Sequence, residues 1–356
     1  MIYDAEHLGE EAYALVKELF PICRSLTGRG VRETLARIAR QVPIEVHEVP
    51  SGTKVFDWEI PAEWNLEEAR LIGPDGDVVV STNATNLHVV GYSQPVDQTL
   101  TLAELRQHLH TLPERPDTIP YVTSYYHPRW GFAMSHRRLE SLKEGTYRAV
   151  IRATLEPGSL TYADCVLPGS SADELLLSTY ICHPSLANDN LSGIAVSAIV
   201  LRELARRERR YTIRGVFAPE TLGAITYLYK NGGHLKEHVR GGLVATCTGD
   251  HGGVVHYKRS RQGHAEIDRT VEHVLARTGT PHRLLDFCPV GSDERQYCSP
   301  GFDLPIGSLM RTYYFDWPAY HTSDDDLSAV SARSLGEMIV LYLRAFEVMD
   351  VNRCWK

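Results

Sequence analysis

The second half of the chain alternates short apolar runs with segments whose apolar residues recur every three or four positions. Short apolar runs are typical of buried strands, and the recurring pattern is typical of helices with one buried face. The predicted strands are residues 175–182, 212–218, 242–248 and 304–310, and the predicted helices are residues 191–207, 222–230, 264–278 and 334–349. Strands separated by helices of this length form a parallel sheet covered on both faces. The pattern therefore predicts an α/β fold with a mixed, largely parallel sheet flanked by helices.

The first part of the chain predicts a helix over residues 4–20, which ends at Pro21, and a second helix after the loop that contains Gly28 and Gly30. The predicted strands here are residues 44–49, 69–73 and 78–81. The elements before residue 76 are expected to join the α/β domain.

Between about residues 86 and 160 the pattern changes to turns, prolines and aromatic residues. It predicts a short helix over residues 100–112, a proline-rich connector, and strands at residues 121–130 and 147–155. We interpret this segment as a smaller, mostly β domain inserted into the α/β domain. The predicted insert is residues 76–159, and the predicted α/β domain is discontinuous, with residues 1–75 and 160–356.

Composition narrows the range of partners. The net charge of −8 argues against a nucleic-acid partner, and no apolar run is long enough to predict a membrane span. The seven cysteines are scattered without a CxxC pair, and the first residues are acidic and polar rather than those of a signal peptide. We therefore expect a cytoplasmic protein with reduced thiols and no cysteine-ligated metal, and a homo-oligomer stays possible.

Residues suited to metal chemistry follow three of the predicted strands. His183 and Asp189 follow the strand at 175–182, Glu220 follows the strand at 212–218, and His321 follows the strand at 304–310. The carboxyl ends of parallel strands lie on one edge of a sheet, so these side chains are expected to converge. Two histidines and an aspartate leave a tetrahedral zinc one open position for water, and a nearby glutamate suits the role of general base.

Taken singly, each of these residues is more often structural, but their order along the chain resembles a known family. The matching stretches are His183, Asn188-Asp189-Asn190-Leu191-Ser192-Gly193, Pro219-Glu220-Thr221-Leu222-Gly223, Ser292-Asp293 and Tyr320-His321-Thr322. They resemble the zinc aminopeptidases of the M28 type and, more narrowly, the DUF4910 group with an inserted DUF2172 domain. The resemblance implies a zinc-exopeptidase-like core, of the phosphorylase/hydrolase-like kind. It also implies that His183, Asp189 and His321 are metal ligands and that Glu220 is the general base.

Two positions depart from the pattern of these peptidases. Thr221 stands where they have a second glutamate ligand, and Thr246 is the nearest match to their further aspartate ligand. Without these two carboxylates, a two-zinc site has too few ligands and too little negative charge. We therefore expect one zinc ion per chain. Asp250 is expected to be a supporting residue near the site or a weak fourth ligand, and it is also a candidate for substrate binding.

Several further residues are candidates for substrate binding. Asp293 and Glu294 suit a substrate ammonium group, and Arg295 suits a carboxylate or an oxyanion. Tyr313 or Tyr314 is a candidate for polarising a carbonyl, and Arg24 for binding a substrate anion. The structural alternatives stay open: internal salt bridges in the 291–297 loop, packing for the tyrosines, and bracing of a loop for Arg24. The three aspartates at 324–326 are expected to cap the segment that follows them, and the carboxylate of one of them is a candidate to orient His321.

Three functions stay open at this point. The first is a mononuclear zinc hydrolase that cleaves an amide bond in a small peptide, as an aminopeptidase does. The second is a deacylase or amidohydrolase for a small N-acylated metabolite or amino sugar. The third is a binding module that keeps the peptidase fold without activity. Glu220 favours the two enzymes, because a binding module has no need of a base beside the metal.

Overall fold

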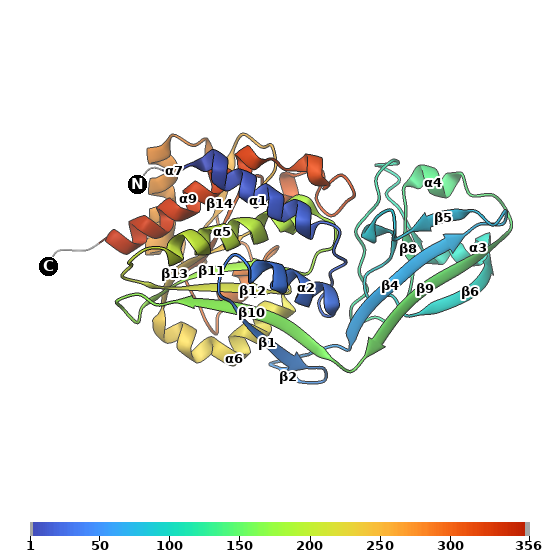
Figure 1. Ribbon diagram of the computed structural model, residues 1–356, viewed down its shortest axis with the longest axis horizontal. Coiled ribbons are helices and arrows are strands. Elements are labelled where there is room, and N and C mark those ends of the chain that lie inside the picture. Colours follow the sequence, from blue (N-terminus) through green and yellow to red (C-terminus); the bar gives the residue numbers. More distant parts are fainter. Residues whose placement is uncertain (1–2, 353–356) are drawn as a thin grey trace.

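The computed structural model describes residues 3–352, which form two lobes that lie side by side (Figure 1). The larger lobe contains a sheet flanked by helices, and the smaller lobe, drawn in blue-green and green, is mostly β. Within the described residues, the larger lobe holds an eight-stranded sheet and the smaller lobe a four-stranded sheet. No helix among these residues has the length and apolar character needed to cross a membrane.

The large sheet has the strand order β1-β10-β12-β11-β13-β16-β14-β15 within the described residues. Its strands are β1 (Glu45–Pro50), β10 (Ser159–Leu167), β11 (Glu174–Tyr180), β12 (Thr212–Ala218), β13 (Val239–Ala245), β14 (Val255–Lys258), β15 (His282–Leu285) and β16 (Ile306–Met310). The central strands β12, β11, β13 and β16 are parallel. The pairs β1–β10, β10–β12 and β14–β16 are antiparallel. The predicted fold class, a mixed and largely parallel sheet in an α/β protein, is confirmed.

Helices cover both faces of this sheet because its central strand is apolar on both sides. Every residue of β11 is buried, and Leu175 and Leu177 belong to one core cluster whereas Leu176 belongs to another. Side chains alternate between the two faces of a strand, so each cluster corresponds to one face.

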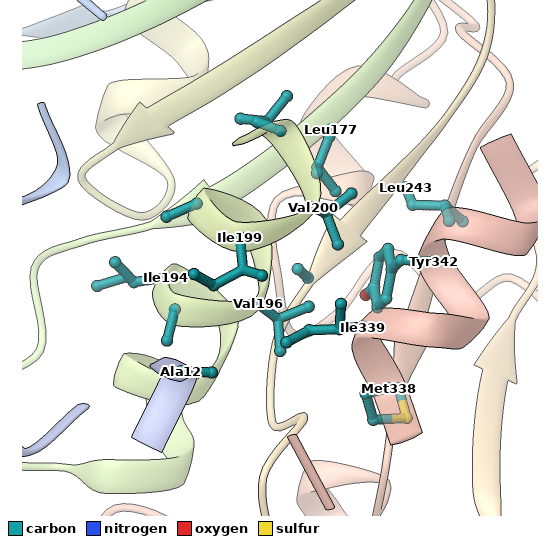
Figure 2. Close-up of a cluster of buried hydrophobic side chains, with 14 of the residues drawn as sticks. Ala12, Leu177, Ile194, Val196, Ile199, Val200, Leu243, Met338, Ile339 and Tyr342 are labelled. Carbon is teal, nitrogen blue, oxygen red and sulfur yellow. The ribbon is translucent and has the colours of Figure 1, made fainter. Parts of the chain in front are cut away.

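The first cluster contains residues of α1 (Ala5–Leu19), α2 (Arg29–Ile38), α5 (Gly193–Ala205), α7 (Glu266–Thr278) and α9 (Ala332–Val351). Figure 2 shows part of this cluster, where side chains of α5 and α9 meet Leu177 and Leu243 of the sheet. The second cluster contains residues of α6 (Leu222–His238) and α8 (Glu294–Tyr297).

The smaller lobe is built on the sheet β5-β4-β9-β6. Its elements are β4 (Glu63–Ile72), β5 (Val78–Ser81), β6 (Val96–Thr101), α3 (Leu102–Leu105), β7 (Leu109–His110), β8 (Phe132–Ala133), α4 (His136–Glu140) and β9 (Thr146–Glu156). The short hairpin of β2 (Lys54–Val55) and β3 (Trp58–Glu59) precedes it. Strand β4 pairs with β9 from Glu63 to Ile72, so the sheet of this lobe begins before residue 76, the predicted start of the insert.

Two elements predicted within the smaller lobe are wrong. The helix predicted at 100–112 is reduced to α3, whose capping box of Thr101 and Glu104 fits a helix start, but the chain enters strand β7 only a few residues later. The strand predicted at 121–130 is irregular, because this aromatic segment crosses to the larger lobe instead of pairing within a sheet.

In the large sheet, strands β10, β14 and β15 were not predicted, and β14 and β15 are only four residues long.

Helices α1 and α9 approach so closely that only glycine fits where they meet. A Cβ atom on Gly336 would lie 1.9 Å from the carbonyl oxygen of Ala5. We expect Gly336→Ala to lower the free energy of unfolding by about 1–3 kcal/mol, measured by urea denaturation, because the backbones must separate. Gly233→Ala is the control: this exposed glycine in α6 has no atom within 4 Å of an added Cβ, so the substitution should stabilise the helix. Equal effects of the two substitutions would contradict the close packing.

An ion pair joins the two lobes near their connection. The guanidinium of Arg32 in α2 donates to both carboxylate oxygens of Glu63 in β4, at 2.8 and 2.6 Å. These bonds lower the pKa of Glu63 from 4.5 to about 2, against the smaller opposing effect of burial. A carboxyl with a lowered folded-state pKa stabilises the protein above its unfolded pKa and loses this contribution as the pH falls toward the folded value.

We therefore expect Glu63→Gln to destabilise the protein at neutral pH, and the difference from the unsubstituted protein to shrink as the pH falls from about 4.5 to about 2. Denaturation with urea across this pH range measures the difference. Glu67→Gln, at an exposed position of the same strand, is the matched control. A difference that stays constant over this range would contradict the assigned role of Glu63.

Candidate metal centre

Loops at the carboxyl edge of the large sheet bring four of the predicted site residues together. His183 follows β11, Asp189 lies in the turn before α5, Glu220 follows β12, and His321 lies between β16 and α9. The Nδ1 atom of His183 is 3.5 Å from Oδ1 of Asp189, and Nε2 of His321 is 3.0 Å from Oδ2 of Asp189. The centroids of the two imidazole rings are 5.2 Å apart.

The polar atoms of this group fit a metal ion. Nδ1 of His183, Oδ2 of Asp189 and Nε2 of His321 are buried and have no hydrogen-bond partner, although buried polar atoms normally have one. Each of the three residues offers a ligand atom within 4.8 Å of the others. Nitrogen and oxygen ligands of a tetrahedral zinc lie about 3.3 Å apart, as follows from bond lengths near 2.0–2.1 Å. The separation of 3.0 Å between Nε2 of His321 and Oδ2 of Asp189 is close to this value, and Nδ1 of His183 lies 3.5 Å from the other oxygen of the same carboxylate, Oδ1.

Asp189 is the ionised centre of this group. Burial alone would raise the pKa of its carboxyl, but His183 and then His321 hold the pKa well below its usual range. The hydroxyl of Tyr180 donates to Oδ1 of Asp189. The carboxylate of Asp325 accepts the backbone N–H groups of Asn188 and Asp189, at 2.6 and 2.9 Å. Asp325 thus supports the loop of Asp189, whereas an aspartate among residues 324–326 was a candidate to orient His321.

Glu220 lies beside the first histidine. Its Oε2 atom is 3.5 Å from Nε2 of His183, and its side chain is 20% exposed. Burial, together with the negative charges of Asp293 and Asp189, raises the pKa of Glu220 well above its usual value. A carboxyl in this environment accepts and returns a proton more readily at neutral pH than an ordinary glutamate does.

Thr221 and Thr246, which stand where the resembled peptidases have carboxylate ligands, form hydrogen bonds with protein groups. The hydroxyl of Thr246 lies 2.7 Å from that of Tyr180, which itself supports Asp189. The N–H of Thr221 donates to Oδ1 of Asp293 at 2.7 Å, and its hydroxyl accepts a bond of 2.6 Å from Arg295. Asp293 and Arg295 are thereby held on the residue that follows Glu220, next to the metal group.

The other predicted substrate residues lie in different surroundings. Glu294 is fully buried and accepts a bond of 2.6 Å from Lys258, and Asp250 accepts bonds from Asn188, Thr312 and the N–H of Gly252. The ring of Tyr313 packs on Tyr314 and Phe315. Arg24 is buried, and its Nε donates to the carbonyl of His183 at 2.9 Å, so this guanidinium braces the loop of a candidate ligand. The contacts of Tyr313 and Arg24 match the structural alternatives that the sequence left open, whereas the partner of Glu294, Lys258, lies outside the 291–297 loop.

The sequence did not point to two tyrosines beside the histidines. Tyr320 stacks on His321 with ring centroids 3.9 Å apart. Tyr121, from the connector of the smaller lobe, lies with its ring centroid 5.2 Å from those of both His183 and His321. The only sequence feature that marks Tyr121 is the proline-rich, aromatic stretch around it, and this stretch does not indicate that Tyr121 lies beside the histidines.

A second group of possible metal ligands, Glu45, His47 and Asp164, lies on β1 and β10. Here the guanidinium of Arg214 is 3.3 Å from Oδ2 of Asp164, and the hydroxyl of Tyr227 donates to the same oxygen. An arginine in this position already neutralises the carboxylate, so this group is less suited to a cation than the group around Asp189.

Comparison with known proteins places the chain in a family. The model of the family described as "domain of unknown function (DUF4910)" matches residues 13–352. The chain belongs to the DUF4910 family. A protein of Clostridium acetobutylicum is 47% identical over 355 residues, which cover 99% of this chain and 81% of that protein. Its name, given provisionally, is polysaccharide biosynthesis protein with aminopeptidase-like domain.

Solved structures of other proteins are similar to this one. A crystal structure from Clostridium acetobutylicum, provisionally named a peptidase, superposes on the DUF4910 chain with a TM-score of 0.96 at 46% identity, covering 98% of this chain and 82% of that one. A zinc aminopeptidase from Bacillus subtilis has a TM-score of 0.69 at 13% identity, covering 97% of this chain and 95% of that one. At this identity the second similarity shows a shared fold, that of zinc aminopeptidases.

The metal group of this DUF4910 protein can be tested by substitution. We expect His183→Ala and His321→Ala each to weaken zinc binding more than about 100-fold, since loss of a mere supporting contact already costs 10–100-fold. Competition with a chromophoric chelator measures the affinity. His282→Ala, at an exposed position of β15, should keep the affinity unchanged. Stoichiometric zinc that is held as tightly in both site variants would rule out this ligand set.

Proposed function

We propose that this DUF4910 protein is a zinc-dependent hydrolase that cleaves an amide bond in the manner of an aminopeptidase. The observation that supports the proposal is the meeting of three unpartnered ligand atoms, from His183, Asp189 and His321, beside the carboxyl of Glu220. When bound, a zinc ion lowers the pKa of a water molecule and polarises the carbonyl of the substrate.

Glu220 is the proposed general base. Its carboxylate accepts a proton from the attacking water and then donates this proton to the leaving amine, as a carboxyl with a raised pKa is able to do. Its exposed fraction of 20% leaves it accessible to a substrate, whereas His183 and Asp189 are buried.

A single zinc ion is proposed for each chain. The positions that supply further carboxylate ligands in the resembled peptidases hold Thr221 and Thr246, and both hydroxyls have protein partners. One aspartate and two neutral imidazoles balance the charge of one divalent ion better than that of two.

Asp293 and Arg295 are the proposed substrate-binding residues. Asp293 is buried and its Oδ2 atom has no hydrogen-bond partner, so it is suited to a substrate ammonium group. Burial raises the pKa of Asp293 to about 7, and a bound ammonium would favour its ionised form. Arg295, anchored on Thr221, is suited to a carboxylate or to the oxygen that becomes negative during hydrolysis. A small peptide presents both kinds of group.

A deacylase for an N-acylated amino sugar is the second candidate. The observation that favours it is the provisional name of the 47% identical relative, which refers to polysaccharide biosynthesis. Both candidates use the same zinc and the same base, and they differ in the substrate.

We also propose that the smaller lobe is the DUF2172-type insert. A cytoplasmic location is proposed because the cysteines at described positions are free thiols.

Substitution of the base tests the proposal. We expect Glu220→Gln to lower kcat by about 100- to 10,000-fold while zinc stays bound, because the amide cannot take the proton of the attacking water. Rates are measured on aminoacyl-nitroanilides and on N-acetylglucosamine derivatives, and zinc by elemental analysis. Glu237→Gln, at an exposed position of α6, is the matched control.

The two substrate panels separate the candidates. Turnover of the aminoacyl compounds supports the peptidase, and turnover of only the N-acetyl sugars supports the deacylase. A zinc-loaded protein that hydrolyses neither, or a Glu220→Gln variant of undiminished activity, would contradict the proposed mechanism.

A further inference from the structure

A segment of the smaller lobe pairs with the loop that carries His321. The N–H of Tyr121 donates to the carbonyl of His321 at 2.9 Å, and the N–H of Ser323 donates to the carbonyl of Ile119 at 2.8 Å. Farther along, Arg115 forms an ion pair of 2.6 Å with Asp324. Backbone pairing of this kind fixes the position of a residue more firmly than a single side-chain contact, so Tyr121 is held at the metal group.

The ring of Tyr121 touches both histidines of this group. Its plane makes angles of 75° with that of His183 and 89° with that of His321, at centroid distances of 5.2 Å. Edge-to-face contacts of this kind are favourable, and together they place the phenol on the cluster. The side chains of His321 and Glu220 are 36% and 20% exposed, so one side of the group borders solvent.

The hydroxyl of Tyr121 is nearly free of protein partners. The structure gives it one neighbour, the hydroxyl of Tyr125 at 3.3 Å, which can accept or donate. Two other nearby phenols differ. The hydroxyl of Tyr180 is bound to Asp189, and the hydroxyl of Tyr314 donates to the carbonyl of Val290. The hydroxyl of Tyr121, unlike these two, is free to donate a hydrogen bond to a bound molecule.

We propose that Tyr121, supplied by the smaller lobe, is a substrate-binding residue whose hydroxyl donates a hydrogen bond to an oxygen atom of a molecule bound at the metal group. This inference rests on the proposed function. The expected ligand is a molecule with a carbonyl or hydroxamate group. The oxygen atom of this group gains negative charge when it lies next to a cation. A phenol is protonated at neutral pH and serves as a donor to such an oxygen. The hydroxyl of Tyr125 remains the second hydrogen-bond partner of the Tyr121 hydroxyl.

The inference gives the smaller lobe a direct part in the site. Within the described residues, the histidines, Asp189 and Glu220 come from the larger lobe, and Tyr121 comes from the segment between β7 and β8. Substrate would then bind where the two lobes meet, with the lobe as one wall of the site.

Binding of acetohydroxamic acid to the cobalt-loaded protein tests the inference without relying on turnover. The visible spectrum of the metal measures the Kd. We expect Tyr121→Phe to weaken binding about three- to tenfold, the effect of one lost hydrogen bond, while the affinity for the metal stays unchanged. Tyr126→Phe is the matched control, because this exposed tyrosine of the same segment donates to the carbonyl of Glu59.

The outcomes separate the two proposals. Unchanged hydroxamate binding in Tyr121→Phe overturns the role of Tyr121, and so does a loss of binding in Tyr320→Phe alone. A cobalt-loaded protein that binds the hydroxamate through Tyr121 but hydrolyses no amide overturns the proposed function and supports the binding role. If Tyr121→Phe loses the metal as well, the phenol acts through the histidines, and the direct hydrogen bond is wrong.

Discussion

The structure depends on one buried carboxylate placed between two imidazoles. Asp189 is completely buried, and an isolated charge at such a depth is very unfavourable. His183 on one side and His321 on the other stabilise its ionised form, which requires the loops after β11 and β16 to meet. Tyr180 and Asp325 hold the same turn by hydrogen bonds, so the surrounding polar contacts position the carboxylate rather than neutralise it.

Thr221 and Thr246 shape the polar contacts around the candidate metal group. Thr221 binds Asp293 through its N–H and Arg295 through its hydroxyl. An acid and a guanidinium are thus anchored beside Glu220. Under the proposed function, this framework of strands carries one cation and its own set of contacts to a substrate.

The two lobes are connected through polar as well as apolar contacts. Arg32 and Glu63 form an ion pair near the point where the chain passes from one lobe to the other, and the segment around Tyr121 pairs with the loop of His321 at the opposite end. A lobe held at two places has a defined position relative to the metal group. This explains how an irregular segment, which has no regular secondary structure of its own, keeps an aromatic side chain in a functional place.

The sequence by itself determined the α/β class, the central strands and most of the long helices, because apolar periodicity is a local property that each segment carries alone. It also indicated which residues follow the strands, and hence that His183, Asp189, Glu220 and His321 converge at one edge. Only the tertiary structure decided which distant partners meet. Glu294 is a candidate for substrate binding by type, yet Lys258 pairs with it in the interior. Tyr121 lies some 200 positions from His321 and has no periodic pattern around it, so its place beside the histidines follows from how the lobes pack.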